Sequence, residues 1–550
     1  MKIILTGRVV TMDSARTVFD TGAVYIDGPA VVATADVGKP APAGFDTATR
    51  IDTHGIIMPG LIELHNHLSY NILGLWNVPQ PFKDRGQWQR HAQYIQLVNG
   101  PMLILSRSAD TRVLAAIARF AETKCLLAGV TTGQGISLKS DHLQRYYRGA
   151  LRVVEDPGEP AFFKAATHIP DLHARDWASF NKELQKAHCL LLHLSEGFDA
   201  AALNAFKALQ DTATGQWAIS KALAGIHCAA LGDAEFDVMG THGASMIWSP
   251  LSNFMLYGRT ARVDLAKNHG VPIALGSDWS PSGSKNLLHE LKVAKVANDV
   301  GGYGFSDADI VAMATSGPAA IVKWSTLVGT IEAGKRADIV VLAAPATADP
   351  YSAIIGARET DVQLVLIDGK ARVATPQWMA ALGAAGEPIE VGAVARSINY
   401  GEPDPGIIAI THLQAMQVLG DALAHLPQVP TPPPGAAHIL SAPPGKQWRL
   451  ALDEQQATGY ALRTMLSFHG AATGPDVERM ALNQLEAAPV GPVPLDKVSV
   501  PDDPGYAATI DRQRNIPADI KAGLKTYYPL PPASQRAPPP LKMQETTGGR

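Results

Sequence analysis

The stretch Met58–Asn71, MPGLIELHNHLSYN, places two histidines one residue apart directly after an apolar run. Side chains alternate between the two faces of a β-strand, so His65 and His67 leave the same face of the strand predicted here. Two neighbouring imidazoles can bind one metal ion. The alternative is an alternating strand that shows two polar residues to solvent, and this stretch alone does not distinguish the two.

The region that follows, from Gly60 to about Trp324, alternates short apolar runs with helical stretches, which predicts βα units. Eight apolar runs occur, at residues 61–67, 129–135, 150–155, 161–168, 189–196, 223–228, 244–250 and 272–278. Eight βα units predict a closed (β/α)8 TIM barrel, an α/β fold whose active site lies at the C-terminal ends of the strands. An open doubly wound sheet would need a Gly-rich phosphate-binding turn after the first strand, and the sequence has none there.

Both flanks of this region have the pattern of short strands separated by turn residues. The Asp-Gly turn in LIDGK, after the barrel, matches the one in YIDGP near the N-terminus. We therefore predict a small β-sandwich domain built from residues 1–57 and 325–375, beside a barrel at residues 58–324.

Residues 376–550 form a proline-rich C-terminal extension, and such proline density excludes long helices and central strands over most of it. One helix is predicted over 412–426. The extension is expected to wrap the main body or to contact another subunit, and we predict a homo-oligomer. The last fifteen or so residues are expected to be disordered.

Composition limits the class of protein. The chain has 550 residues, of which 46% are hydrophobic and 18% charged, so it can bury a large core. A net charge of −4 without a long basic run argues against nucleic acid or an anionic membrane as partner. The first apolar run is too short for a signal peptide, and the three cysteines are too few for a disulfide framework. We predict a soluble cytoplasmic protein.

Metal-binding side chains also end other predicted strands. His193 ends the fifth run, His227 the sixth and Asp278 the eighth. Imidazole and carboxylate ligands suit Zn²⁺ and other first-row divalent ions. Because barrel enzymes keep their chemistry at these strand ends, the pattern predicts one metal site. His168, near the end of the fourth run, is held as a further candidate.

Glu196 follows His193 by three residues. A carboxylate there can lie beside the metal without binding it and pass a proton to a substrate nitrogen. The alternative is a solvated loop carboxylate.

A loop of roughly forty residues, far above the usual connection length, separates His67 from the helix predicted at Thr111. Its aromatic content argues against disorder and indicates a lid over the barrel mouth that offers flat apolar surface to a substrate. The alternative is that the aromatic residues pack the loop onto the body. The predicted substrate-binding residues are Trp76 and Trp88 in this loop, together with Trp248, Asn253 and Trp279, which follow predicted strand ends.

The chain resembles the amidohydrolase superfamily of metal-dependent hydrolases over residues 1–374. The matching segments follow the family order: PGLIELHNH, AGVTTG, HLSE, GIHC, SPLSN, LGSDWSPSG, MATSGPAAI and VGTIEAGKRADIVVL. The His-x-x-Glu step is similar to the branch that holds cytosine and guanine deaminases, adenosine-type nucleoside deaminases and triazine hydrolases. This resemblance implies one metal ion per subunit, Zn²⁺ or Fe²⁺, and hydrolysis of a C–N bond in a cyclic or aryl-bearing small molecule.

The resemblance also implies roles residue by residue. Glu196 becomes the proton shuttle, and His227 with Asp278 orients or deprotonates the reacting water. Glu63 stands where the family usually has aspartate, and the extension after residue 376 is absent from the usual family domain. The implied metal ligands are His65, His67, His193 and Asp278.

Two other functions compete. A two-metal cyclic amidase or dipeptidase of the same superfamily would bridge its ions with a carboxylated lysine, for which Lys164 is the candidate. Such enzymes generally lack a glutamate at the position of Glu196. A non-catalytic scaffold would have lost its ligands, whereas every expected ligand is present here.

Overall fold

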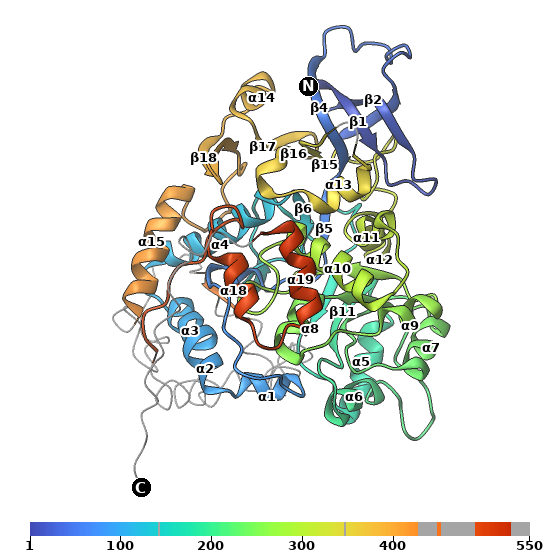
Figure 1. Ribbon diagram of the computed structural model, residues 1–550, viewed down its shortest axis with the longest axis vertical. Helices are drawn as coiled ribbons and strands as arrows, with labels where there is room; N and C mark the ends of the chain where they lie inside the picture. The colour runs from blue at the N-terminus through green and yellow to red at the C-terminus, as the bar shows by residue number, and fades with distance from the viewer. Residues whose placement is uncertain (141–142, 346–347, 427–447, 453–489, 530–550) are drawn as a thin grey trace.

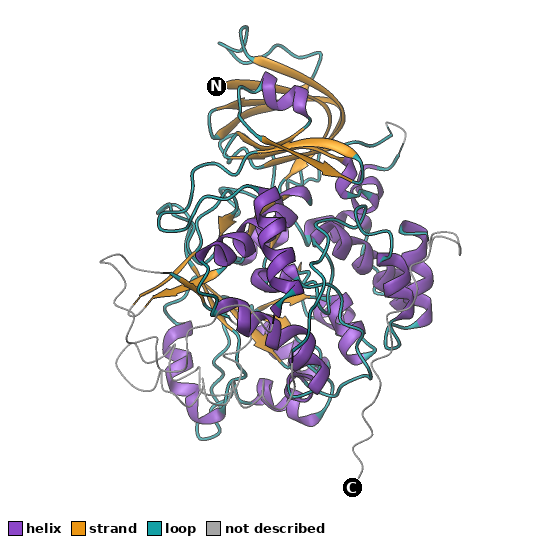
Figure 2. Ribbon diagram, turned by 90° about the vertical axis from the view of Figure 1, so that its left-hand side faces the viewer, coloured by secondary structure: helices purple, strands orange, loops and turns teal. Residues whose placement is uncertain are grey.

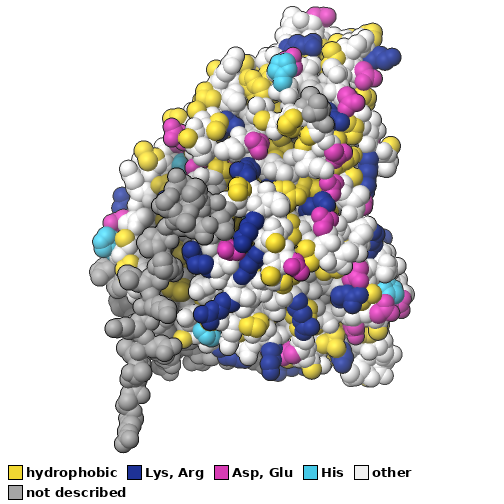
Figure 3. Space-filling model, viewed as in Figure 1, with side chains coloured by type: hydrophobic (Ala, Val, Ile, Leu, Met, Phe, Trp, Pro, Cys, Tyr) yellow, Lys and Arg dark blue, Asp and Glu magenta, His cyan; other side chains and the backbone are white. Residues whose placement is uncertain are grey.

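The computed structural model describes residues 1–140, 143–345, 348–426, 448–452 and 490–529. A β-rich unit that holds the N-terminus stands at one end of a larger, helix-covered body (Figures 1 and 2). Acidic and basic side chains are interspersed over the face seen in Figure 3. No helix among the described residues is long and apolar enough to cross a membrane.

Strands from both flanks of the barrel region form one nine-stranded sheet in the order β18-β19-β17-β16-β15-β4-β1-β2-β3. The two flanks meet at β4, which pairs parallel with β1 and antiparallel with β15. The sheet continues past residue 375, where the sequence predicted the extension to begin. Its strands are β1 (Lys2–Val10), β2 (Val18–Asp27), β3 (Ala30–Asp36), β4 (Thr49–Pro59), β15 (Ile339–Leu342), β16 (Val362–Ile367), β17 (Lys370–Ala374), β18 (Glu387–Val391) and β19 (Val394–Ile398).

The two Asp-Gly turns seen in the sequence lie against each other in this sheet. Asp368 and Gly369, between β16 and β17, have φ values of 51° and 68°, as a tight two-residue hairpin turn requires. A Cβ atom added at Gly369 would collide with the carbonyl oxygen of Gly28 in the other turn. Glycine at 369 therefore allows the two ends of the chain to approach closely.

Parallel strands form the body, as expected for an α/β fold. One sheet has the order β10-β11-β12-β13-β14 and another the order β5-β6-β9. The five-stranded sheet follows chain order, whereas a doubly wound sheet reverses its order at a switch point. Each of the eight predicted runs contains one strand: β5 (Leu61–Glu63), β6 (Val130–Gly133), β9 (Arg152–Val153), β10 (Ala165–His168), β11 (Cys189–Leu194), β12 (Leu223–His227), β13 (Ser245–Trp248) and β14 (Ile273–Leu275).

Backbone hydrogen bonds continue between the two parallel sheets at both of their edges. The amide of Ala165 donates to the carbonyl of Val154 over 2.9 Å. At the other edge the amide of Asp278 donates to His65 over 3.0 Å, and that of His67 donates to Asp278 over 2.7 Å. The end of β14 is thereby fixed beside the end of β5.

Helices cover these strands, and two of those predicted from sequence appear as α4 (Thr111–Leu127) and α15 (His412–Ala424), which pack on each other. A reciprocal pair of hydrogen bonds between Thr411 and Gln414 caps the start of α15. The other helices are α1 (Arg85–Gln89), α2 (Ala92–Tyr94), α3 (Gly100–Ser106), α5 (Trp177–Leu184), α6 (Ala200–Lys207), α7 (Asp233–Thr241), α8 (Pro250–Tyr257), α9 (Val263–Asn268), α10 (Leu287–Gly301), α11 (Asp307–Ala312), α12 (Ser316–Ile321), α13 (Pro350–Gly356), α14 (Pro376–Ala381), α18 (Tyr506–Arg512) and α19 (Ala518–Tyr527). A small sheet not predicted from sequence contains β7 (Ser137–Ser140), β8 (Leu143–Tyr146) and β20 (Arg449–Leu450).

The long loop after His67 is ordered and largely helical. It contains the short helices η1 (Leu68–Ile72) and η2 (Ile95–Asn99) together with α1, α2 and α3. Its aromatic side chains are each at most 4% exposed, so in this structure they pack the loop onto the body. They are Tyr70, Trp76, Phe82, Trp88 and Tyr94.

The described part of the C-terminal extension wraps the body through helices. Helix α19 packs on α10 and on α18, and both α18 and α19 lie at the front of the body in Figure 1. Leu495 forms an antiparallel bridge with Leu73 in the loop after His67. The proline-rich stretch at 429–438 and the final fifteen residues lie outside the described residues.

Candidate metal centre

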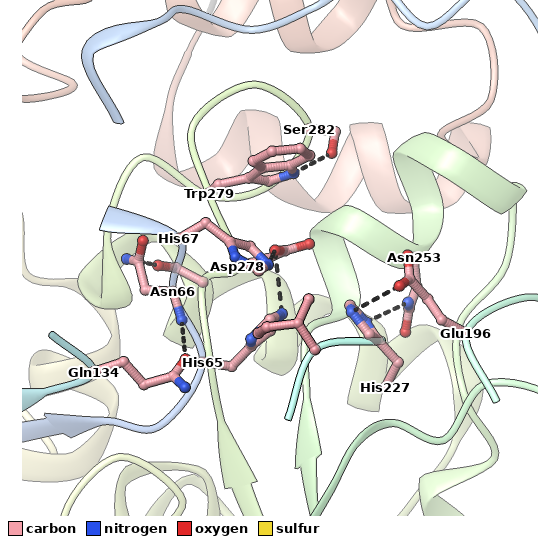
Figure 4. Close-up of polar contacts among 12 residues, drawn as sticks. His65, Asn66, His67, Gln134, Glu196, His227, Asn253, Asp278, Trp279 and Ser282 are labelled. Atoms are coloured by element: carbon pink, nitrogen blue, oxygen red, sulfur yellow. Dashed lines mark hydrogen bonds and ion pairs between the residues drawn. The ribbon is translucent and has the colours of Figure 1, made fainter. Parts of the chain in front are cut away.

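The predicted ligands come together in one buried cluster. Figure 4 shows His65, His67 and Asp278 of this cluster. Nε2 of His65 lies 3.1 Å and Nε2 of His67 lies 3.4 Å from the same carboxylate oxygen of Asp278. The rings of His193 and His227 lie 4.8 and 4.9 Å from the ring of His65, centre to centre. Two sets of three have donor atoms within 4.8 Å of one another: His65, His193 and His227, and His65, His67 and Asp278.

Each member of the cluster stands at or just beyond the C-terminal end of a parallel strand. His65 follows β5, His193 lies near the end of β11, His227 ends β12 and Asp278 follows β14. His227 and Asp278 have left-handed backbones, with φ values of 66° and 64°. Such conformations cost about 1–3 kcal/mol each and occur where a function requires a particular side-chain direction.

Glu63, at the position where the family that the sequence resembles usually has aspartate, ties β5 to the strand end that carries Asp278. Its carboxylate accepts a hydrogen bond from the amide of Ser277 over 3.0 Å and another from the Ser277 hydroxyl. Asn66 donates to the same hydroxyl over 3.0 Å. Burial raises the pKa of Glu63. The longer side chain of glutamate therefore still connects the two ligand-bearing segments.

Electrostatics favours ligands in their metal-binding forms. Burial lowers the pKa of His193 and of His227 well below its usual value, which keeps both imidazoles neutral. Burial alone would raise the pKa of Asp278, but the imidazoles of His65 and His67 lower it overall, so the carboxylate is ionised. Neutral imidazole and ionised carboxylate are the forms that bind a metal ion.

His193 offers a direct test of whether the cluster fits a metal. Its Nδ1 is buried, and no hydrogen-bond partner for it occurs within the described ranges. Buried polar atoms are nearly always paired, so an orphaned nitrogen in a ring that packs among three other histidines requires an explanation. A first-row divalent ion such as Zn²⁺, held by imidazoles and one carboxylate, fits this donor set.

Glu196 is buried beside the cluster and is not a solvated loop carboxylate. The Tyr257 hydroxyl donates to its Oε1 over 2.7 Å, and Arg85 lies 3.4 Å from its Oε2. Nε2 of His227 lies 3.7 Å from the same Oε2. Trp88, in α1, donates to the Tyr257 hydroxyl over 2.9 Å. The loop helix α1 thus supplies two of the residues that hold Glu196 in place.

Sequence analysis did not indicate Arg85 or Tyr257. Tyr257 lies four residues after Asn253, which places both on one face of α8 beside the predicted site. That spacing could have identified it. Arg85 follows no strand end, and its position depends on how the long loop folds back, which carries no local sequence signal.

A chain of hydrogen bonds leads from Trp248 to His227, and each residue in it donates to the next. The indole of Trp248 donates to Thr260 over 2.7 Å, and Thr260 donates to the amide oxygen of Asn253 over 3.3 Å. The amide nitrogen of Asn253 lies 3.2 Å from Nδ1 of His227. In this arrangement Nδ1 accepts, and Nε2 carries the proton that faces Glu196. Asn253 and Trp248, predicted to bind substrate, are placed to orient His227.

The other predicted substrate-binding residues lie at different distances from the histidine cluster. Trp279 packs on His67 with ring centres 5.3 Å apart and lies 5.9 Å from Trp88. Trp76 packs on Phe82 and Tyr94, both at 6.0 Å, and lies one layer further from the cluster. The structure therefore places Trp88 and Trp279 beside the cluster and Trp76 behind them.

Lys164 is not placed to bridge two metal ions. It precedes β10, at the strand end opposite to the cluster, and its side chain is 67% exposed. Its ammonium group pairs with Asp156 over 2.7 Å. The assignment of Lys164 as a bridging ligand is therefore wrong. His168 lies at the correct end of β10, where burial and then Arg85 lower its pKa to about 4, but it belongs to neither set of three.

The chain is similar in sequence and in fold to known proteins. A model of the amidohydrolase family matches residues 173–372. The 5-methylthioadenosine/S-adenosylhomocysteine deaminase of Acetivibrio thermocellus is 30% identical over 155 residues, 26% of this chain and 36% of that protein, so the match spans about a third of that relative. The deaminase of the same name from Symbiobacterium thermophilum is 24% identical over 432 residues, 67% of this chain and 92% of that protein. A crystal structure of a triazine hydrolase variant, 18% identical, covers 67% of this chain and 94% of its own with a TM-score of 0.50, which shows a shared fold.

Proposed function

This chain has the sequence pattern and the fold of the amidohydrolase family, and from that premise we propose that it is a metal-dependent hydrolase of a C–N bond in a cyclic or aryl-bearing small molecule. One observation carries the proposal: four imidazoles and one carboxylate from four strand ends converge beside a buried glutamate. A scaffold has no need of such a cluster, because buried ionisable groups destabilise a fold unless they are compensated.

The proposed metal ligands are His65, His67, His193 and Asp278. A bound Zn²⁺ would act as a Lewis acid and lower the pKa of a coordinated water from about 15.7 to about 7. Asp278 and His227 face the same space. Asp278 is placed to accept the proton of the reacting water, and the Nε2–H of His227 is placed to orient that water. Fe²⁺ has the same ligand preferences and stays an alternative.

Glu196 is proposed to carry the proton to the substrate. Its Oε2 faces His227, while Tyr257 and Arg85 fix the direction of the carboxylate. A carboxyl group so held delivers a proton to a ring nitrogen or to the departing amine. Water then adds at the ring carbon, the C–N bond breaks and an amine or ammonia leaves.

For the substrate we propose an N-heterocycle with an amino group on the ring. The relatives reported above are named as deaminases of 5-methylthioadenosine and S-adenosylhomocysteine, and both substrates carry such a ring. In this chain Trp279 packs on His67 and Trp88 packs on Trp279, and we propose that these indoles bind a planar ring.

The finer architecture is part of the proposal. We infer that the eight parallel strands close into a (β/α)8 barrel, supported by the backbone bonds at Ala165 and Asp278. We also infer that the nine-stranded sheet is a β-sandwich domain, with the chain after it as an extension. The cysteines are buried and unpaired, which supports a reducing, cytoplasmic compartment. A homo-oligomer stays a prediction.

Elemental analysis of protein purified without added metal or chelator tests the proposal. We expect about one zinc or iron per chain, the stoichiometry of a catalytic site of this kind. Ammonia release is then measured over a panel of amino-substituted purines, pyrimidines and triazines. The double variant His65→Ala/His67→Ala should lose both metal and activity. Two ions per chain, or a metal-free active enzyme, would contradict the proposal.

A further inference from the structure

A buried carboxylate from the C-terminal segment (residues 490–529) lies between two buried lysines of the body. Asp496 Oδ2 is 2.7 Å from the ammonium group of Lys124, and its Oδ1 is 2.7 Å from that of Lys285. Both lysine side chains are 1% exposed. Lys285 also lies 3.3 Å from Asp503. The four groups balance, two positive against two negative, and Asp496 is the member that contacts both cations.

Lys124 connects this charge cluster to the metal centre. Its ammonium group donates to the backbone carbonyl of Asn71 over 3.0 Å and to the Ser280 hydroxyl over 2.6 Å. The side chain of Asn71 in turn accepts from the amide of Ser280 over 2.9 Å and donates to Asn66 over 2.8 Å. Asn66 lies between His65 and His67, and Ser280 lies two residues after Asp278. Both ligand-bearing segments are therefore held by the groups that Lys124 contacts.

The charge state of Lys124 depends on its carboxylate partner. Burial lowers the pKa of Lys124 to about 8, although Asp496 acts in the opposite direction. For Lys285 the two aspartates outweigh burial, and its pKa is raised. Without Asp496, a lysine surrounded by apolar core would lose its only carboxylate contact among the described residues. A neutral or displaced Lys124 cannot hold Asn71 and Ser280 as the protonated side chain does.

The same segment contacts two other parts of the site. The amide of Asp496 donates to the carbonyl of Ile72 over 2.9 Å. The side chain of Gln513 pairs with the backbone of Trp76 and Val78, at 3.2 and 3.3 Å. Asn515 donates over 2.7 Å to the carbonyl of Met255 in α8, the helix that carries Asn253 and Tyr257. The C-terminal segment thus touches the loop after His67, the loop after Asp278 and α8.

We propose that Asp496 is a positioning residue for the metal centre, acting through Lys124, Asn71 and Ser280, and that the C-terminal segment is a built part of the active site. The extension that the usual family domain lacks therefore has a specific role here. The inference rests on the proposed function in one respect only, that the histidine cluster binds a metal ion.

Three variants of the full chain test it: Asp496→Asn, the double variant Lys124→Met/Asp496→Asn, and Asp511→Asn as the matched control. Asp511 lies in the same segment, but its ion pair is a half-exposed one with Lys525 and not one with Lys124 or Lys285. The measurements are zinc affinity by chelator competition, midpoint of thermal unfolding, and kcat and KM on whichever substrate the panel identifies.

We expect Asp496→Asn to lower zinc affinity and kcat at least about tenfold, as loss of groups that orient metal ligands does, with a smaller change in KM. Asp511→Asn should match wild type. The double variant removes one charge of each sign, so it should regain thermal stability. It should not regain zinc affinity or kcat, because Asn71 and Ser280 still lack Lys124.

Three results would decide against it. Wild-type zinc affinity and kcat in Asp496→Asn would overturn the inference, and so would recovery of both in the double variant, since Asp496 would then only balance charge. If Asp496→Asn does not fold, the double variant carries the test in the same way. A wild-type protein that binds no metal would instead overturn the proposed function, whatever the variants do.

Discussion

At the scale of single residues, the role proposed for Glu196 can be tested separately from metal binding. It belongs to neither set of clustered ligands, and its oxygens are engaged by Tyr257, Arg85 and His227. We expect Glu196→Gln to reduce kcat by about 10²–10⁴-fold, the usual contribution of a positioned acid–base group, while the metal content stays at the wild-type level. Steady-state kinetics and elemental analysis on the same preparation check this. Loss of the metal would make Glu196 a ligand.

Glu290 gives the protein a pH-dependent stability. It is buried on α10, where it accepts hydrogen bonds from the amide of Leu251 and the hydroxyl of Ser284, and burial raises its pKa from 4.5 to about 8. Between these values the folded carboxyl keeps its proton while the unfolded one has lost it. Its contribution is therefore complete at low pH and is lost as the pH rises to about 8.

The matched variant for this prediction is Glu290→Gln, whose amide resembles the protonated carboxyl in shape and hydrogen bonding. We expect the midpoint of thermal unfolding to fall less in the variant than in wild type between about pH 5 and about pH 8. Differential scanning calorimetry across that range measures it. Parallel pH profiles for the two proteins would contradict the raised pKa.

Residues whose role follows from local periodicity could be predicted from the sequence. His65, His67, His193, His227 and Asp278 were found because they end strands, and strand ends meet at one face of a barrel. Arg85 and Asp496 reach the site through the folding of a long loop and a distant segment. No local pattern marks such residues, because their partners are chosen by tertiary contacts.

At the scale of elements, α8 holds both sides of the proposed proton path. Asn253 and Tyr257, one turn apart, contact His227 and Glu196 respectively. Tyr257→Phe removes one hydrogen bond to a charged group, worth about 1.5–3 kcal/mol, so kcat should fall about 10–100-fold with KM little changed. Tyr351→Phe, which removes a hydroxyl that donates to the carbonyl of Arg16 away from the proposed site, is the control. An unchanged kcat in Tyr257→Phe would remove the hydroxyl from the mechanism.

The strands of the barrel region were predicted more reliably than the elements outside it. All eight apolar runs of the barrel region contain a strand, because alternation and burial are local properties. The hairpin β18–β19 was missed because it lies in a segment judged by its proline content, although the prolines concentrate further along the chain. The ordered loop after His67 was expected, but not its helix α1 beside Glu196.

At the scale of the whole molecule, the metal should stabilise the fold as well as the site. An ion that binds only the folded state adds RT ln(1 + [L]/Kd), about 4 kcal/mol at a thousandfold excess over Kd. Protein stripped by a chelator should therefore unfold at lower temperature and recover when Zn²⁺ is returned. The His65→Ala/His67→Ala variant should unfold at one temperature with or without Zn²⁺. Equal midpoints for stripped and loaded wild type would contradict a site inside the core.

Strand β4 pairs with β1 and with β15, so one of its two partners is synthesised much later than β4 itself. Strand β4 ends at Pro59, and its second neighbour begins at Ile339. A ribosome that adds about 5–20 residues per second leaves one edge of β4 unpaired for on the order of tens of seconds. Unpaired apolar edges are sites of aggregation. The nascent chain is therefore prone to aggregate through β4 until the strand that begins at Ile339 has emerged and paired with it. Chaperones would be most useful during that interval.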